Sequence, residues 1–114
     1  MRKVAVKLTA GLLGLLVAFA AAGDCTSNMC SDVYVDQIYV ESVTDNWIRT
    51  SGTETNLSIC APDSGVYLWL DGTVAQKKEV LSLLMMADAI EKPLSIKLTN
   101  GAHGCQISYV FINR

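Results

Sequence analysis

Short runs of alternating hydrophobic and polar residues follow one another beyond residue 32, which predicts a mainly β protein. The first run covers residues 33–43. Its apolar phase slips by one residue across Asp36-Gln37, as a β-bulge in a long, bent strand would make it. Asp45-Asn46 predicts a turn. Further runs bounded by turn residues predict strands over 47–50, 57–60 and 66–70.

One segment has helical periodicity instead. Thr73 and Gln76 have the spacing of a capping box, and Pro93 predicts that the helix ends near Glu91. At about 100° per residue, the helix has two apolar surfaces on nearly opposite sides. The broad one, which we expect to pack on the core, contains Val80, Leu83, Leu84, Met86, Ala87 and Ile90. The narrow one is a stripe of Leu81, Met85 and Ala89.

A predicted hairpin follows the helix. Residues 94–98 alternate strictly, so we expect one buried face and one polar face in water. Asn100-Gly101 predicts the turn, and residues 106–112 have apolar side chains on both faces, as a central strand does. Strands, one helix and a terminal hairpin are the order of a small OB-fold barrel. The sequence therefore predicts a mainly β fold with one helix (α+β), a five- to six-stranded OB-like barrel capped by a single α-helix and stapled by disulfides.

The first 22 residues have the layout of a secretory signal peptide. Arg2, Lys3 and Lys7 precede an apolar stretch, and Ala20-Ala21-Ala22 is an A-x-A cleavage site. An uncleaved anchor is the alternative, but the stretch is short of the ~20 residues that a membrane span needs. We expect residues 1–22 to be a bacterial signal peptide. Residues 23–114 are then one exported domain, periplasmic or extracellular, that does not associate with the membrane after cleavage.

Cleavage of this signal would make the protein acidic. The chain has nine Lys and Arg against eleven Asp and Glu. Without the three basic residues of the signal, six remain, and the net charge becomes −5. The pair Lys77-Lys78 is the only basic cluster left. Such a chain has no electrostatic reason to bind nucleic acid or anionic lipid, so neither is expected as a partner.

Four cysteines lie in the expected mature domain: Cys25, Cys30, Cys60 and Cys105. An even number in a small exported chain indicates two disulfides, and the sequence alone allows three pairings. We predict Cys25–Cys30 as a local loop and Cys60–Cys105 as the long-range link. A zinc site is the competing interpretation, which the lack of any C-x-x-C motif disfavours. We expect no metal and no cofactor.

The second half of the chain is similar to a known family. Asp71, Gln76-Lys77-Lys78, the predicted helix and residues 94–103 resemble the C-terminal half of enterotoxin-type B subunits, the pentameric receptor-binding rings of AB5 toxins. The resemblance implies an OB-fold subunit that binds a receptor without catalysis. It does not extend to the family's galactose site, because Thr99 stands near the position of the stacking tryptophan. The chain also resembles short uncharacterised secreted bacterial proteins with paired cysteines.

Few residues are candidates for chemistry. His103 is the only histidine, and no G-x-S-x-G motif or catalytic-cysteine context accompanies it, so we expect a polar loop residue and no enzyme. Trp47, Tyr67 and Trp69 are candidates to stack on a sugar, because aromatic rings offer flat apolar faces. Tyr67 and Trp69 alternate with residues 66, 68 and 70, so one of these two sets is expected to be core.

Two functional classes follow. The first is a non-catalytic exported binding module that recognises a glycan or a protein and self-associates. The second is a monomeric periplasmic or secreted structural or inhibitor protein. The stripe of Leu81, Met85 and Ala89 distinguishes the two classes. One barrel cannot cover both this stripe and the opposite face of the helix, and a monomer should not leave the stripe exposed. We predict a homo-oligomer that buries the stripe. The alternative is that residues 23–32 fold over it within one chain.

Overall fold

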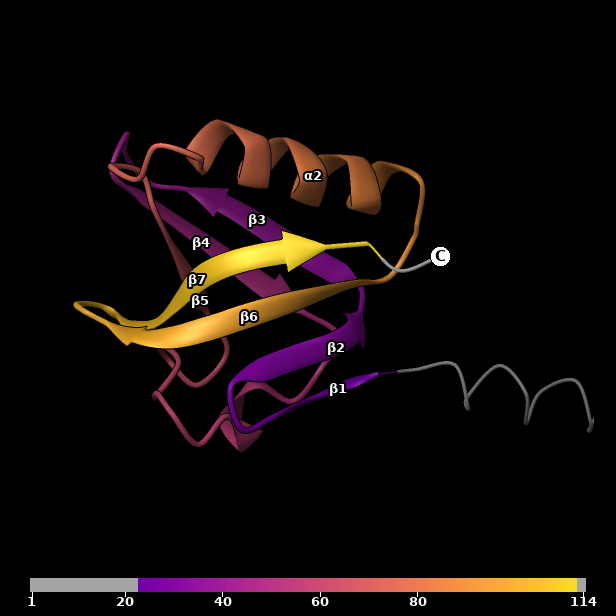
Figure 1. Ribbon diagram of the computed structural model, residues 1–114, viewed down its shortest axis with the longest axis vertical. Coiled ribbons are helices and arrows are strands. Elements are labelled where there is room, and N and C mark those ends of the chain that lie inside the picture. Colours follow the sequence, from indigo (N-terminus) through magenta and orange to yellow (C-terminus); the bar gives the residue numbers. More distant parts are fainter. Residues whose placement is uncertain (1–22, 113–114) are drawn as a thin grey trace, which may run out of the picture.

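Seven strands form one sheet, in the order β1-β2-β6-β7-β5-β4-β3, and one α-helix packs against it. The computed structural model describes residues 23–112, and Figure 1 shows how the elements are arranged. Within these described residues, the predicted mainly β class with one α-helix is confirmed. The strands are β1 (Asp24–Thr26), β2 (Met29–Val33), β3 (Val35–Val40), β4 (Asp45–Thr50), β5 (Leu68–Asp71), β6 (Leu94–Gly101) and β7 (Gly104–Phe111). The helices are the short 3-10 helix η1 (Glu54–Asn56) and α2 (Lys77–Ala89).

The long first strand predicted over 33–43 is divided in two. Tyr34 alone separates β2 from β3, and the chain changes its partner there: β2 pairs with β6, and β3 pairs with β4. The predicted bulge is confirmed, because the β3–β4 register shifts between Val35 and Gln37. This division and the additional strand β1 raise the number of strands to seven, instead of five or six. The sheet is open in its strand order, which starts at β1 and ends at β3.

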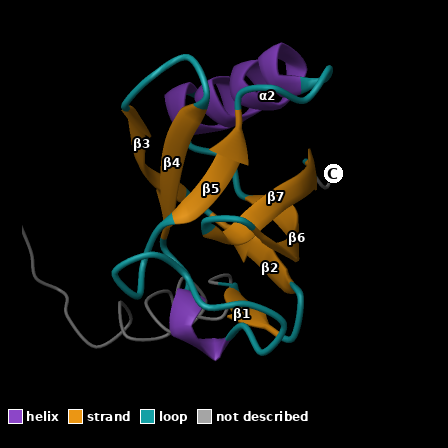
Figure 2. Cartoon of the chain, turned by 90° about the vertical axis from the view of Figure 1, so that its left-hand side faces the viewer, coloured by secondary structure: helices purple, strands orange, loops and turns teal. Residues whose placement is uncertain are grey.

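The second half of the sheet contains the terminal hairpin. β6 and β7 pair from Ser95↔Phe111 to Gly101↔Gly104, so the loop consists of Ala102 and His103 and lies just beyond the predicted turn. β7 also runs parallel to β5, with Trp69 beside Gln106. The predicted central position of the last strand is therefore confirmed. Figure 2 shows β3, β4 and β5 side by side, with β7, β6 and β2 beyond them.

Helix α2 begins later than the capping-box spacing predicted. The Thr73 backbone N–H and hydroxyl both donate to Asp71 Oδ1, at 2.8 and 2.7 Å, so this hydroxyl does not cap the helix. The N-cap is Gln76, whose side chain makes no capping bond. At the other end, the Lys92 N–H donates to the Ala87 carbonyl, and Glu91 has a positive φ, as the residue after a helix often does. The helix therefore ends at Ala89.

The predicted core face of the helix is narrower than expected. Val80, Leu84 and Ala87 are buried against the sheet, whereas the Met86 and Ile90 side chains are 48% and 57% exposed. Those two residues were wrongly assigned to the core. The remainder of the core comes from alternate strand residues, because one face of each strand points toward the helix side of the sheet. Its largest fully buried side chains include Ile48, Leu68, Leu70, Leu94, Ile96 and Leu98.

Three local predictions were wrong. Residues 57–60 form no strand, because Leu57 makes a single bridge to Ser27 and the chain then bends away. Asp45 and Asn46 belong to β4, and the turn lies just before them. Ser95, expected on a wet face, is buried and its hydroxyl accepts a hydrogen bond from the Asp32 N–H.

Both predicted disulfides are confirmed. Cys25 and Cys30 are joined across β1 and β2, where they face each other in register. Cys60 and Cys105 are joined between the loop before β5 and the start of β7. Two disulfides are consistent with an oxidising, extracytoplasmic location. Residues 23–112 contain no helix long and apolar enough to cross a membrane. The signal-peptide prediction concerns residues 1–22, which lie outside the described residues.

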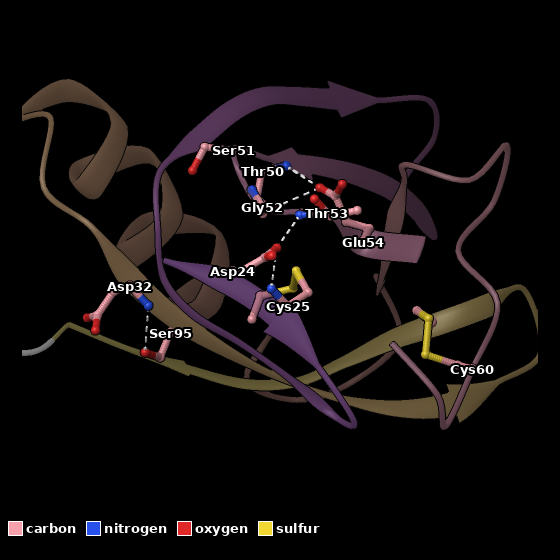
Figure 3. The surroundings of a disulfide bond; sticks show 12 residues. Asp24, Cys25, Asp32, Thr50, Ser51, Gly52, Thr53, Glu54, Cys60 and Ser95 are labelled. Carbon is pink, nitrogen blue, oxygen red and sulfur yellow. Dashed lines mark hydrogen bonds between the residues drawn. A yellow bond between two sulfur atoms is a disulfide. The ribbon is translucent and has the colours of Figure 1, made fainter. Parts of the chain in front are cut away.

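Two carboxylates fasten the loop between β4 and η1 (Figure 3). Glu54, which is 4% exposed, accepts hydrogen bonds from the Thr50 N–H at 2.7 Å and the Thr50 hydroxyl at 2.8 Å. Asp24 accepts one from the Thr53 N–H at 2.6 Å and one from the Cys25 N–H at 2.7 Å. The backbone bonds from Thr53 and Cys25 hold the pKa of Asp24 below its ordinary value. This loop is therefore tied to both β4 and β1.

Candidate functional site

One surface of the sheet brings aromatic side chains together. Tyr39, Trp47 and Trp69 are direct neighbours across β3, β4 and β5, and Gln106 of β7 lies beside Trp69. The next residues along these strands, such as Ile48 and Leu68, are fully buried. Because side chains alternate along a strand, the aromatic row lies on the outer face of the sheet, away from the core.

His103 adds a fourth ring to this row. It comes from the β6–β7 loop, and its ring lies edge-on to Trp69, with the ring centroids 4.4 Å apart at an interplanar angle of 80°. Its centroid is 6.3 Å from that of Trp47. We call Tyr39, Trp47, Trp69 and His103 the aromatic face. The strand register and one hairpin loop assemble it from four separate segments.

The two indole rings are held by carboxylates. Trp47 Nε1 donates to Glu41 Oε1 at 2.9 Å, and Trp69 Nε1 donates to Asp45 Oδ1 at 3.1 Å. Each bond restricts the orientation of its ring, as hydrogen bonds from supporting residues do in a preorganised binding site. Trp69 is 6% exposed, whereas Trp47 is half-buried and Tyr39 is 48% exposed. Trp47 and Tyr39 therefore offer the accessible ring surface, and Trp69 lies beside Trp47 on the neighbouring strand.

Polar groups border the aromatic face at both ends. At one end, the half-buried Tyr67 donates its hydroxyl proton to Gln37 Oε1 at 3.2 Å, and Gln37 pairs with Arg49 across β3 and β4. At the other end, Asp45 and Asp71 face each other across β4 and β5. Accessible ring faces between hydrogen-bonding groups are the kind of surface on which a sugar ring can stack.

Asp71 is a carboxylate with a low pKa. The Thr73 backbone N–H and hydroxyl that donate to it hold its pKa below the ordinary value, and His103 acts weakly in the same direction. Both bonds from Thr73 use Oδ1. Within residues 23–112, no salt bridge joins Glu41, Asp45 or Asp71 to a basic side chain. The lowered pKa keeps Asp71 ionised at neutral pH, so this border of the aromatic face has a negative charge there.

The sequence identified part of this site. Trp47 and Trp69, predicted as stacking residues, are brought together, and Tyr67, the third such residue, lies just before β5, two residues from Trp69. The alternating set Leu68 and Leu70 is the core set. Tyr39 was missed, although it lies in the first predicted strand run, next to Ile38, which packs against the core. His103 does lie in a hairpin loop, but its contact with Trp69 depends on a long-range pairing that no local pattern reveals.

The second predicted surface, the stripe on α2, is only partly open. Leu81 is half-buried against the core, whereas Met85 is 55% exposed and Ala89 is exposed. Residues 23–32 do not cover this stripe. They form β1 and most of β2, at the edge of the sheet that lies far from α2 (Figure 1). The two exposed residues of the stripe adjoin the exposed Met86 and Ile90. We call this apolar surface the helix patch: Met85, Met86, Ala89 and Ile90.

Neither surface contains a ready metal site. Among residues 23–112, no group of three or more His, Cys, Asp and Glu side chains is arranged to hold a metal ion. A comparison with protein-family models found no match, and searches of curated proteins and of solved structures found none either. The physical features of the surfaces are therefore the basis for a functional proposal.

Proposed function

We propose that this protein is an exported, non-catalytic binding module that recognises a carbohydrate on its aromatic face. The observation that carries the proposal is the row of Tyr39, Trp47 and Trp69, with carboxylates fixing both indole rings. Large aromatic side chains that serve only the core are buried, whereas this row lies on the outer face of the sheet and Trp47 and Tyr39 stay accessible. The two disulfides support export.

The strand pairing supports an OB-like assignment as part of this proposal. If β2, Tyr34 and β3 are taken as one bent strand, it pairs with β6 through one half and with β4 through the other. The helix then lies between the third and fourth strands, and the third runs parallel to the last. In OB folds, the second and third strands and the adjoining loops bind oligosaccharides or oligonucleotides. In this reading those strands are β4 and β5, which carry Trp47 and Trp69.

A glycan array tests the proposal. The mature protein, with both disulfides intact, is expected to bind at least one class of saccharide equally well with and without a chelator. Trp47→Ala should weaken that binding by about tenfold, because loss of an exposed stacking ring costs on the order of 1 kcal/mol. Tyr109→Ala, which removes an exposed aromatic ring on β7, is the matched control and should bind normally. Turnover of a saccharide, or binding lost on chelation, would contradict the proposal.

We further propose that the module self-associates through the helix patch. Met85 and Met86 of α2 and its C-cap residue Ile90 are exposed apolar side chains on neighbouring turns. Leu81 contributes less than the stripe suggested, because it already packs against the core. The alternative, a monomeric structural or inhibitor protein, would leave the helix patch in water.

Light scattering on the mature protein separates these two alternatives. We expect an oligomer at micromolar concentration, and we expect Met85→Lys combined with Ile90→Glu to give a folded monomer. Burying each such side chain contributes roughly 1.5–3 kcal/mol relative to leaving it exposed. The control exchanges the charges of two exposed neighbours, Lys78→Glu with Glu79→Lys, and should remain an oligomer. A wild type with the mass of one chain would rule out self-association.

A further inference from the structure

The charges around the aromatic face bear on which saccharides it selects. Glu41 and Asp45 accept the indole N–H bonds of Trp47 and Trp69, and Asp71 lies opposite Asp45 on the neighbouring strand. Each carboxylate is therefore tied to the aromatic row by a hydrogen bond or by strand register. A ligand lying on Trp47 would have these groups at its edge.

No lysine or arginine side chain of the described residues pairs with these carboxylates, and His103 acts on Asp71 only weakly. No basic side chain within residues 23–112 forms a salt bridge with any of the three. Arg49, the basic residue of β4, is two positions beyond Trp47, on the side away from Asp45. They are also not grouped closely enough to form a metal site in the described chain. The negative charge therefore remains for a ligand to neutralise.

We infer that the aromatic face selects saccharides carrying a free, protonated amine, such as glucosamine units, over neutral or anionic sugars. A protonated amine gains from the carboxylates and from the accessible face of Trp47, since both attract cations. A sialylated or sulfated sugar meets repulsion at the same edge. This inference rests on the proposed carbohydrate-binding function and specifies its substrate class.

Three probes distinguish the possibilities: a glucosamine oligomer, the N-acetylated oligomer of equal length, and a sialylated oligosaccharide. At neutral pH and low salt, we expect the glucosamine oligomer to bind the mature protein about tenfold more tightly than the N-acetylated one, and the sialylated one not to bind. Asp45→Asn combined with Asp71→Asn should abolish the preference for the amine. Asparagine keeps an acceptor oxygen for Trp69 and Thr73, so the rings should stay in place.

The control is Glu79→Gln combined with Asp88→Asn on exposed positions of α2, which changes the net charge equally. It should keep the preference. If this control loses the preference as well, non-specific charge attraction explains it, and the inference is wrong. Equal or tighter binding of the N-acetylated oligomer would also overturn the amine selection, while leaving carbohydrate binding intact. If none of the three probes binds and the glycan array also shows no saccharide binding, the proposed function itself is rejected.

Discussion

Replacing Cys60 and Cys105 by alanine should lower the free energy of unfolding by about 4 kcal/mol. This disulfide spans 45 residues, and in the chain-entropy model the loss grows with the length of the closed loop. It also fixes the loop before β5 to the start of β7, where Trp69 and His103 come together. At ~4–8 °C per kcal/mol for a domain of this size, the melting temperature should fall by more than about 15 °C.

The other disulfide is the internal comparison. Cys25 and Cys30 are separated by five residues, so their replacement by alanine should cost about 2 kcal/mol by the same reasoning. Thermal and denaturant unfolding of the two double variants measures the difference. An equal loss in both would show that loop length does not govern the stabilisation, contrary to this account.

Glu54→Ala should lower the free energy of unfolding by about 3 kcal/mol. The carboxylate accepts two hydrogen bonds from Thr50, and both residues are buried. Hydrogen bonds to a charged group contribute roughly 1.5–3 kcal/mol each, and a buried donor left without an acceptor carries its own cost. Figure 3 shows that these bonds hold the loop against the end of β4.

Two further variants show whether the hydrogen bonds are responsible. Glu54→Gln keeps an acceptor oxygen and should retain about half of the stabilisation or more. Glu79→Ala, at an exposed position of α2, should change stability by less than about 0.5 kcal/mol. Chemical denaturation of all three variants gives the comparison. If Glu54→Ala unfolded like Glu79→Ala, Glu54 would have no role in fastening the loop.

The sequence predicted features that depend on local alternation or on compartment. Period-two patterns located β6 and most of β4 and β5, and the phase slip at Asp36-Gln37 located the bulge. The even cysteine count gave two disulfides, and the long-range choice Cys60–Cys105 is confirmed. The alternation signals are strong because a one-residue shift of a strand would turn its apolar face to solvent.

Features that depend on competition between side chains were not predictable in this way. Thr73 could cap a helix or bond to Asp71, and the second arrangement moves the start of α2 to Lys77. Residues 57–60 alternate like a strand, yet Leu57 has only one bridge partner, so no ladder forms. Met86 and Ile90 fit a helical apolar face, but only a narrower part of that face is buried against the sheet.

The candidate site was predictable only in part for the same reason. Trp47 and Trp69 were singled out as aromatic residues in predicted strands, but their pairing required the antiparallel register of β4 and β5. Tyr39 needed the register of β3 as well, and His103 needed a hairpin to fold back onto β5. Contacts between distant segments follow from topology, which single-segment patterns do not contain.

The most direct test of the central claim, that the aromatic face binds carbohydrate, is an NMR titration that follows the indole N–H signals of Trp47 and Trp69. These protons belong to the rings themselves and are hydrogen-bonded to Glu41 and Asp45, so a sugar placed on the rings changes their surroundings and must perturb them. We predict saturable shifts of both signals on addition of a saccharide that binds on the array, and loss of the Trp69 shift in Trp47→Ala. Saccharide binding that leaves both indole signals unchanged would contradict the claim.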